Sequence, residues 1–466
     1  METGPLKPGL VIDGFRLNEP LKPGGMSNLW RVSHDDLALP MVMKIPLVRG
    51  GPVNIVGFEV EGMILPRLGG AHVPRFIKAG DLSDPYIVME FIVGRPLKDR
   101  IDATPLPPHE VAAIGAAIAI ALHDLHTQHV IHLDLKPSNV IMRASGEAAL
   151  IDFGLSHHDQ LPDLLAEEIG GPIGTGPYIS PEQVLGDRSD PRSDLFALGV
   201  ILYFLATGER PFGEPTSARE WRRRLWRDPV PPRAWNPQVS PGLQEIILRC
   251  LEVEPVARPA TAAELAFALR NPECVILTER ATRMRRDGAL QVAARWLKAR
   301  KARLPPARRS VASHLARAPI IMAAIDLAPG HEGLCEASSV AVSRLLATEP
   351  GARLACVNVL KSSLLSIDPT EDADGRSIHL QRLLALKHWA RALPVPAERL
   401  TFHVLEAADP ADALVGFART NRVDHIVLGA RASSALRRYL GSVSAQVVAE
   451  APCTVTVVRA PASSAE

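Results

Sequence analysis

Hydrophobic and polar positions along the chain divide it into two regions with different patterns. In residues 319–459, short apolar runs rich in Val and Ile alternate with segments of helical periodicity. Such alternation is typical of a parallel sheet with helices on both faces. The predicted strands and helices are 320–327, 336–346, 353–360, 378–393, 401–405, 410–420, 424–428, 442–449 and 454–458. The pattern therefore predicts a doubly wound α/β domain, whose ligands would bind at the carboxyl ends of the strands.

One lysine in the first 270 residues lies inside a predicted strand. Apolar residues surround Lys44 over 41–45, and a buried lysine is costly unless an acid pairs with it. On the helix that follows, two leucines lie four and seven positions after Glu61 and share its face. Glu61 is therefore the predicted partner, in preference to Glu59, which lies off that face. The alternative is a lysine that snorkels from an edge strand.

Length and composition limit the class of protein. At 466 residues the chain is too long for a single core. With 47% hydrophobic and 22% charged residues, the composition is that of a globular protein. Five scattered cysteines without CxxC spacing argue against a disulfide framework and a zinc site.

Neither a signal peptide nor a transmembrane segment is predicted. The first residues lack a basic start and an apolar core. The longest apolar run, 111–122, lies in a helix predicted over 108–129 and is shorter than the roughly 20 residues that span a bilayer. We therefore expect a soluble, cytoplasmic protein.

The net charge of +1 conceals a basic segment. Residues 280–317 hold twelve Lys/Arg and one acid. Apolar residues at helical spacing predict that this connector is partly helical, with a helix that ends at Pro305-Pro306. A solvated linker is the favoured interpretation, with docking to the acidic remainder or an anionic surface as the alternative. Nucleic-acid binding is less favoured, because the segment has one aromatic residue, Trp296. The predicted organisation is a first domain over 1–272, the connector over 273–317, a second domain over 318–460 and a tail over 461–466.

The strongest chemical signal is a pair of motifs. The first, at 132–139, reads HLDLKPSN, and the second, at 152–154, reads DFG. Asp134, Lys136 and Asn139, followed by Asp152, form a set that can hold the metal ions of a nucleotide and deprotonate a hydroxyl. This segment resembles the catalytic and metal-binding loops of eukaryotic-like, bacterial serine/threonine protein kinases. The resemblance implies the bilobal α+β kinase fold, ATP and Mg²⁺ as cofactors, and protein substrates.

The resemblance also implies a role for each residue. Asp134 would be the base, Lys136 would neutralise the transferred phosphoryl group, and Asn139 and Asp152 would hold magnesium. Lys44 would bind the α- and β-phosphates. The remaining implied positions are Gly24 and Gly25 in the phosphate-covering turn LKPGGMSNLW, Thr175 beside the base, the buried pair Glu182–Arg258, and Asp194 as the anchor of the catalytic loop. In that turn Lys22 and Ser27 replace the outer glycines, which stiffens the loop.

One departure from the kinase pattern concerns regulation. Leu133 occupies the position before the base, where phosphorylation-regulated kinases carry an arginine that receives the phosphate. Between His157 and Gly174 there is no Ser, Thr or Tyr, and four acids lie there instead: Asp159, Asp163, Glu167 and Glu168. We therefore expect activity without activation-loop phosphorylation, and control from elsewhere in the chain.

The end of the second domain carries a further signature. The stretch 429–444, GARASSALRRYLGSVS, resembles the universal stress protein family, as do Asp326 after the first strand and the last strand. The family's nucleotide-binding members show Gly-x2-Gly-x9-Gly-Ser/Thr; here Ala432 replaces the second glycine, and eight residues precede Gly441. Two interpretations stay open. Asp326, Gly429, Gly441 and Ser442 bind a second nucleotide, ATP or AMP, or the domain is a dimerisation or sensing module without nucleotide, with a homodimer formed through it.

Two hypotheses for the whole chain follow. The leading one is a serine/threonine protein kinase regulated by its C-terminal domain. The alternative is a catalytically weak, kinase-like scaffold that binds nucleotide, which the altered glycine turn favours.

Overall fold

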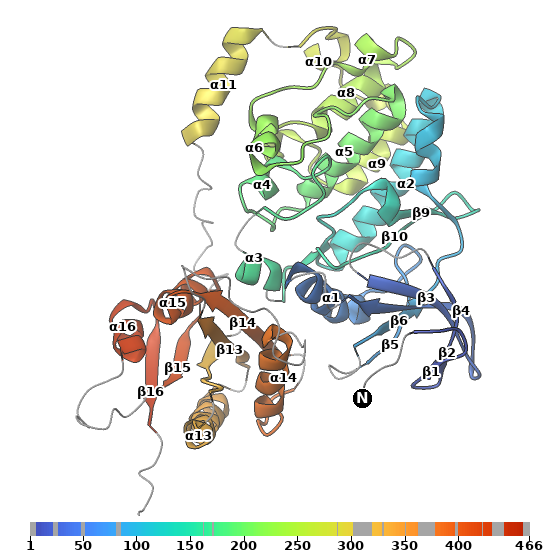
Figure 1. Ribbon diagram of the computed structural model, residues 1–466. Helices are drawn as coiled ribbons and strands as arrows, with labels where there is room; N and C mark the ends of the chain where they lie inside the picture. The colour runs from blue at the N-terminus through green and yellow to red at the C-terminus, as the bar shows by residue number, and fades with distance from the viewer. Residues whose placement is uncertain are drawn as a thin grey trace, which may run out of the picture. The chain divides into compact units, whose positions relative to one another are not determined.

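The computed structural model folds into two compact units, residues 1–306 and 307–466 (Figure 1). It describes residues 6–21, 27–47, 52–80, 85–161, 163–169, 172–286, 288–301, 319–328, 330–349, 351–361, 378–396, 399–421, 423–430 and 442–459. The first unit has a sheet-rich part and a helical part, and the second is a parallel sheet with helices. The predicted fold class, a bilobal α+β domain followed by a doubly wound α/β domain, is confirmed.

The first unit begins with an antiparallel six-stranded sheet in the order β1-β2-β3-β4-β6-β5. The strands are β1 (Val11–Ile12), β2 (Phe15–Pro20), β3 (Ser27–His34), β4 (Leu37–Pro46), β5 (Phe76–Ala79) and β6 (Ile87–Glu90). Alternate residues of β4 point to opposite faces. Met41 and Met43 pack with Trp30 on one face, whereas Val42 packs with Val56 of helix α1 (Pro52–Ile64) on the other. This alternation places Lys44 on the face that α1 covers.

The helical part is built around α2 (Pro108–Thr127) and α5 (Arg192–Thr207), which pack against each other, with α8 (Pro241–Cys250) and α9 (Ala262–Arg270) beside them. Helix α5 is buried from Ser193 to its last residue. Its C-terminus is capped by Gly208, which has a φ of +76° that a side chain would strain. In the sheet-rich part, the 3₁₀ helix η2 (Leu65–Arg67) follows α1 and contacts β5. The short elements of the helical part are β7 (Arg95–Pro96), β8 (Val130–Ile131), β9 (Val140–Met142), β10 (Ala148–Leu150), β11 (His157–His158), α3 (Leu164–Ile169), α4 (Pro181–Val184), α6 (Ala218–Trp221), α7 (Pro232–Trp235), and the 3₁₀ helices η3 (Leu97–Ala103), η4 (Pro137–Asn139), η5 (Arg222–Leu225), η6 (Pro255–Ala257) and η7 (Pro272–Cys274).

Helix α2 is, within the described ranges, the one helix whose length and apolar composition would suffice to cross a membrane. Half of that apolar stretch is buried inside the protein, and α2 packs against α5 and α9. Core helices of globular domains pass the same test, so its apolar character is accounted for by this packing.

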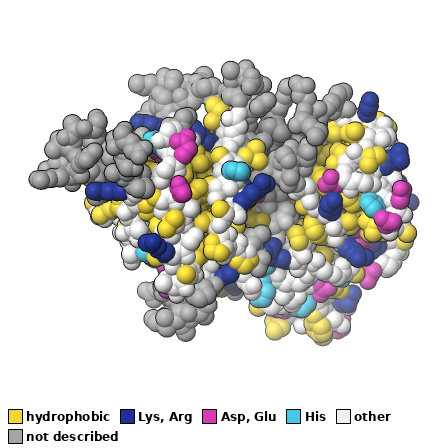
Figure 2. Space-filling model, turned by 90° about the horizontal axis from the view of Figure 1, so that it is seen from below, with side chains coloured by type: hydrophobic (Ala, Val, Ile, Leu, Met, Phe, Trp, Pro, Cys, Tyr) yellow, Lys and Arg dark blue, Asp and Glu magenta, His cyan; other side chains and the backbone are white. Residues whose placement is uncertain are grey.

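The connector begins as part of the first unit. Its helix α10 (Glu279–Thr282) packs on α8, where the buried side-chain amide of Gln244 donates to the carbonyls of Arg280, Ala281 and Arg283 at 2.7–3.2 Å. Helix α11 (Ala289–Lys301) follows as the basic helix that the sequence predicts. Residues 302–317 lie outside the described ranges. Unlike the basic helix α11, the face of the molecule shown in Figure 2 carries interspersed basic, acidic and apolar side chains.

The second unit contains a five-stranded parallel sheet in the order β14-β13-β12-β15-β16. The strands are β12 (Ile320–Ala324), β13 (Arg353–Lys361), β14 (Leu400–Ala407), β15 (His425–Gly429) and β16 (Thr454–Val458), and the helices are α13 (Glu332–Thr348), α14 (Ile378–Ala390), α15 (Pro410–Asn421) and α16 (Ser442–Glu450). Two apolar clusters lie on opposite faces of the sheet, one with α13 and α14 and the other with α15 and α16. The strand order reverses between β12 and β15, so the ligand-binding edge of such sheets falls there.

Candidate active site

Lys44 on the central strand β4 lies between two carboxylates from distant parts of the chain. Its ammonium group forms an ion pair with Glu61 of α1 and donates to Asp152 Oδ1 at 2.8 Å. Glu61 is 1% exposed, whereas the Asp152 side chain is 41% exposed and stays accessible. Burial alone would lower the pKa of Lys44, but the two carboxylates raise it above its usual range, so the lysine stays charged. The structure thus pairs Lys44 with Glu61, away from any sheet edge.

Asp194, near the start of α5, holds the backbone that leads to Asp134. Its carboxylate accepts hydrogen bonds from the N–H groups of His132 and Leu133, both at 2.8 Å, and lies 2.9 Å from His126 Nε2. Leu133 has a φ of +60°, a left-handed conformation that costs about 1 kcal/mol or more. The two N–H bonds stabilise this turn, after which Asp134 enters the site.

The Asp134 carboxylate is buried and has defined partners for both oxygens. Oδ1 accepts from Thr175 Oγ1 at 2.5 Å, and Oδ2 accepts from Lys136 Nζ at 2.6 Å. Lys136 also donates to Thr175 Oγ1 at 3.1 Å. The Asn139 amide nitrogen donates to the Asp134 carbonyl at 3.0 Å, and its amide oxygen accepts from Ser138 Oγ at 3.2 Å and keeps a second lone pair. The four side chains form one network.

Asn139 and Asp152 come from the two ends of a hairpin. Asn139 immediately precedes β9, and Asp152 follows β10 by two residues; the Ile151 N–H donates to the Asn139 carbonyl at 3.0 Å. Lys44 keeps the pKa of Asp152 below its usual range against the opposing effect of burial. A carboxylate and an amide oxygen are hard ligands of the kind that magnesium takes together with phosphate oxygens.

Residues 174–183 are held against the catalytic loop. The Gln183 amide donates to the Leu133 carbonyl at 2.8 Å, and Ser180 and Gln183 form a reciprocal capping box at the start of α4. Glu182 accepts two bonds from Arg258, both at 2.7 Å, in a buried bidentate pair. These contacts position Thr175, and with it one side of the Asp134 network.

The activation segment contains a clamp that the sequence did not predict. Asp163, whose side chain is 16% exposed, accepts from Arg188 Nε at 2.8 Å and lies 3.4 Å from His157 Nδ1. Arg188 also donates to the carbonyls of Leu155 and Ser156. Burial would raise the pKa of Asp163, but His157 and Arg188 overcome this and lower it to about 2. The clamp precedes α3, whose Leu164 and Leu165 are buried. Arg188 follows no helical or strand period that would pair it with Asp163, so the sequence pattern could not have identified the clamp.

Helix α1 approaches the DFG segment at backbone distance. A Cβ placed on Gly57 would lie 3.0 Å from the Gly154 carbonyl oxygen, and one on Gly154 would lie 3.2 Å from the Gly57 carbonyl oxygen. Glycine within a helix costs about 1 kcal/mol relative to alanine, so Gly57 was a signal of close approach in the sequence. The contact holds Glu61 beside Asp152.

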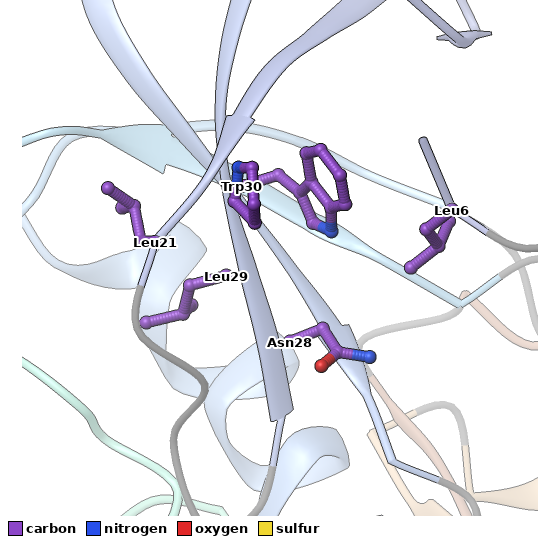
Figure 3. Close-up of a pocket in the computed structure, with 6 residues that line it drawn as sticks. Leu6, Leu21, Asn28, Leu29 and Trp30 are labelled. Atoms are coloured by element: carbon purple, nitrogen blue, oxygen red, sulfur yellow. The ribbon is translucent and has the colours of Figure 1, made fainter. Parts of the chain in front are cut away.

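The phosphate-covering turn cannot be described, because Gly24 and Gly25 lie outside the described residues, as does Lys22. The strands that flank it line a cavity of about 400 Å³ (Figure 3). Its described lining consists of Leu6, Pro20, Leu21, Asn28, Leu29 and Trp30. Leu29 lies opposite Lys44 in the strand register, so their side chains share one face. Its described lining shares no residue with the cluster around Asp134.

In the second unit, two of the predicted nucleotide-binding residues lie on neighbouring strands. Asp326 follows β12, with Oδ2 at 3.2 Å from His331 Nδ1, and Gly429 ends β15. A Cβ on Gly429 would lie 2.4 Å from Leu334 Cδ2, so helix packing itself requires glycine there. Ser442 is exposed at the first position of α16. Gly441 and Ala432 lie outside the described residues.

Comparison with known families agrees with this geometry. Residues 58–268 match the family model of the protein kinase domain, so the chain contains a protein kinase domain. Domains of this class use ATP with magnesium. Residues 319–459 match the model of the universal stress protein family. The protein is thus a protein kinase domain followed by a universal stress protein domain.

Several curated proteins are similar to the first part. Serine/threonine-protein kinase PknB of Mycobacterium leprae is 31% identical over 269 residues, 55% of this chain and 43% of that protein. Kinases pkn2 and Pkn1 of Myxococcus xanthus are 33% and 32% identical, over 56% and 61% of this chain and 32% and 42% of their own lengths. The chain thus spans less than half of these relatives. Among solved structures, the PknI kinase domain of Mycobacterium tuberculosis has a TM-score of 0.45 at 23% identity, covering 57% of this chain and 99% of that domain.

Proposed function

We propose that the protein is a serine/threonine protein kinase that transfers the γ-phosphate of ATP to Ser or Thr of protein substrates. The carrying observation is the network in which the Asp134 carboxylate accepts from Lys136 and Thr175. Such a carboxylate can accept the proton of a hydroxyl as that hydroxyl attacks phosphorus. The neighbouring cluster of Lys44, Glu61 and Asp152 supplies the matching phosphate and metal contacts.

The residues fit ATP with magnesium. Lys44 would contact the α- and β-phosphates, Asp152 and the Asn139 amide oxygen would hold magnesium, and Gly24 and Gly25 would cover the phosphates. Bound Mg-ATP supplies the phosphoryl group. Asp134 orients the acceptor hydroxyl and takes its proton, and Lys136, at 2.6 Å from that carboxylate, neutralises the charge that develops beside it.

A radiolabelled ATP assay tests this function. Asp134→Ala and Asp152→Ala should each lower the transfer rate by about 10²–10⁴-fold, because they remove proton transfer or charge neutralisation in the transition state. Asp159→Ala, at an exposed acid of the same segment, is the matched control and should leave the rate within about twofold. Equal residual rates in wild type and both variants would instead favour the kinase-like scaffold.

The activation loop is proposed to work without phosphorylation. Leu133 replaces the phosphate-receiving arginine, and Asp163 already provides a carboxylate bound to Arg188. Phosphatase-treated protein should therefore match untreated protein in rate. A large loss of rate, traced to a phosphate within residues 152–182, would contradict this.

The universal stress protein domain is proposed to regulate the kinase unit. The protein is also proposed to be cytoplasmic. Residues 278–283 of the connector bind to the kinase unit through Gln244 and Glu245. Because the connector leads on to the second domain, a change in that domain could alter these contacts. Deleting residues 318–466 should change the rate or the oligomeric state, the latter if the domain forms a homodimer. If the truncated protein and the full chain have equal transfer rates, salt responses and masses in solution, the second domain does not regulate the kinase unit.

A second nucleotide, ATP or AMP, is the proposed ligand of that domain. Asp326 follows β12 at the switch point of the sheet. The buried Asn358 of the neighbouring strand β13 donates to the Ile325 carbonyl, and its Oδ1 has no hydrogen-bond partner among the described residues. Gly441→Glu should abolish nucleotide binding in calorimetry of the full chain with the kinase site blocked by Lys44→Met. Unchanged binding in Gly441→Glu would place the nucleotide elsewhere.

A further inference from the structure

The loop that follows Thr175 is supported by one buried arginine. Arg224 is 1% exposed, and its guanidinium donates to the carbonyls of Gly176, at 2.7 Å, and of Ile179. Burial lowers the pKa of Arg224 to about 9. Trp221 packs on the same loop, since a Cβ on Gly176 would lie 3.0 Å from its Nε1. Elements α6 and η5 are therefore in direct contact with the segment that borders Asp134.

The same short segment is strongly basic on its outer side. Between residues 219 and 228 there are five arginines and two acids. Arg219, Arg222 and Arg227 are exposed, and within the described ranges none of the three forms an ion pair. Arg219 and Arg222 are three positions apart in consecutive helical turns, so they lie on one side. These exposed arginines, with Arg223, are named the arginine face.

Among the described residues, neither nearby acid forms an ion pair with Arg219, Arg222 or Arg227. Asp228 is bound by two arginines of the connector: Arg283 at 3.1 Å and Arg295 of α11 at 2.6 Å. Glu220 accepts from Thr216 within its own turn and lies at 4.0 Å from Arg223. The docked connector thus adds positive charge beside η5, which contacts both α4 and α11.

We propose that the arginine face binds acidic side chains of the substrate, so that the kinase selects Ser or Thr within acidic protein segments. This rests on the proposed kinase function. The face adjoins the loop beside Asp134, so the chain on either side of an acceptor hydroxyl bound there must pass near it. The planar guanidinium group of an exposed arginine can donate two parallel hydrogen bonds to a carboxylate. A peptide is favoured over a nucleic acid as the ligand, because a protein substrate must place its Ser or Thr beside Asp134 and so lies next to this loop.

Binding of a fluorescein-labelled peptide, measured by anisotropy on the full chain, tests the proposal without requiring catalysis. In one peptide a single Thr is flanked by Asp, and in the other by Asn. Wild type should prefer the Asp peptide, and the preference should fall as salt rises from about 0.05 to 0.5 M, because screening shortens the reach of charge. Arg219→Gln/Arg222→Gln should reduce the preference by about fivefold, as expected for two exposed ion pairs.

The control removes the same charge elsewhere. Arg16→Gln/Arg270→Gln, at exposed arginines of β2 and α9, should leave the preference unchanged. Equal preference in wild type and Arg219→Gln/Arg222→Gln overturns the proposal, as does an equal loss in the control. Tighter binding of an oligouridine than of the Asp peptide, lost in the same variant, overturns it in favour of nucleic acid. If the peptide preference holds but wild type transfers no phosphate, the arginine face stands and the proposed kinase function fails.

Discussion

Asp163→Asn should release the activation segment without unfolding the protein. The substitution keeps the shape of the side chain but removes the charge that binds Arg188 Nε at 2.8 Å and faces His157. In the folded protein these partners hold the pKa of Asp163 at about 2, below the usual 3.8. Because a pKa difference of one is about 1.4 kcal/mol, the clamp contributes about 2 kcal/mol to local stability.

Hydrogen exchange, measured by mass spectrometry on the full chain, reports the free energy of local opening of the activation segment. Loss of about 2 kcal/mol should accelerate exchange of the amides in residues 155–169 by about 30-fold. Asp159→Asn in the same segment is the control, since its side chain is 55% exposed and contacts His129 at the surface; it should change exchange by less than about threefold.

The pH dependence follows from the sign of the pKa change. A depressed pKa means that the stabilisation is complete above the unfolded-state value near 4 and is lost as pH falls through about 2. The part of the difference between wild type and Asp163→Asn that is due to ionisation of Asp163 should therefore be complete above about pH 5, after correction for intrinsic exchange, and shrink below about pH 4. Equal protection in the two proteins at neutral pH would refute the clamp.

Two further substitutions test packing. Gly57→Ala places a methyl group 3.0 Å from the Gly154 carbonyl oxygen and should lower the transfer rate about tenfold by displacing α1. Gly62→Ala, on the same helix with its nearest contact at 3.8 Å, is the control and should leave the rate unchanged. Equal rates in the two variants would contradict the close approach of α1 to Gly154. Arg258→Ala removes the bidentate partner of a buried glutamate and should cost about 3–5 kcal/mol, lowering the kinase-unit transition in calorimetry by roughly 6–15 °C. Arg249→Ala, at a partly exposed ion pair, is the comparison; a shift in Arg258→Ala no larger than in Arg249→Ala would show that the buried pair contributes little.

Local patterns in the sequence were sufficient for several features. Strand–helix alternation predicted each strand that is described in the second unit, with ends that differ by a few residues. Asp134, Lys136 and Asn139 lie within six residues of one another, so any turn that exposes one brings the others close. Pairing of Lys44 followed from the cost of burying a lone charge and from the helical face of Glu61. The roles assigned to these residues and to the second nucleotide site stay predictions.

Other features depend on how distant segments meet. Asp163 and Arg188, Gly57 and Gly154, and Arg224 with the loop after Thr175 are each separated by tens of residues. Their sequence neighbourhoods carry no periodicity that would pair them.

The sequence by itself determined the elements, the two domains and the chemical residue types, because helical and strand periods and burial costs act over a few residues. Only the tertiary structure decided which carboxylate Arg188 binds, which backbone Gly57 touches and where the basic connector docks. Several residues could satisfy each of these requirements equally well. The choice among them is made by packing of the whole core, where the path of the chain sets the distances.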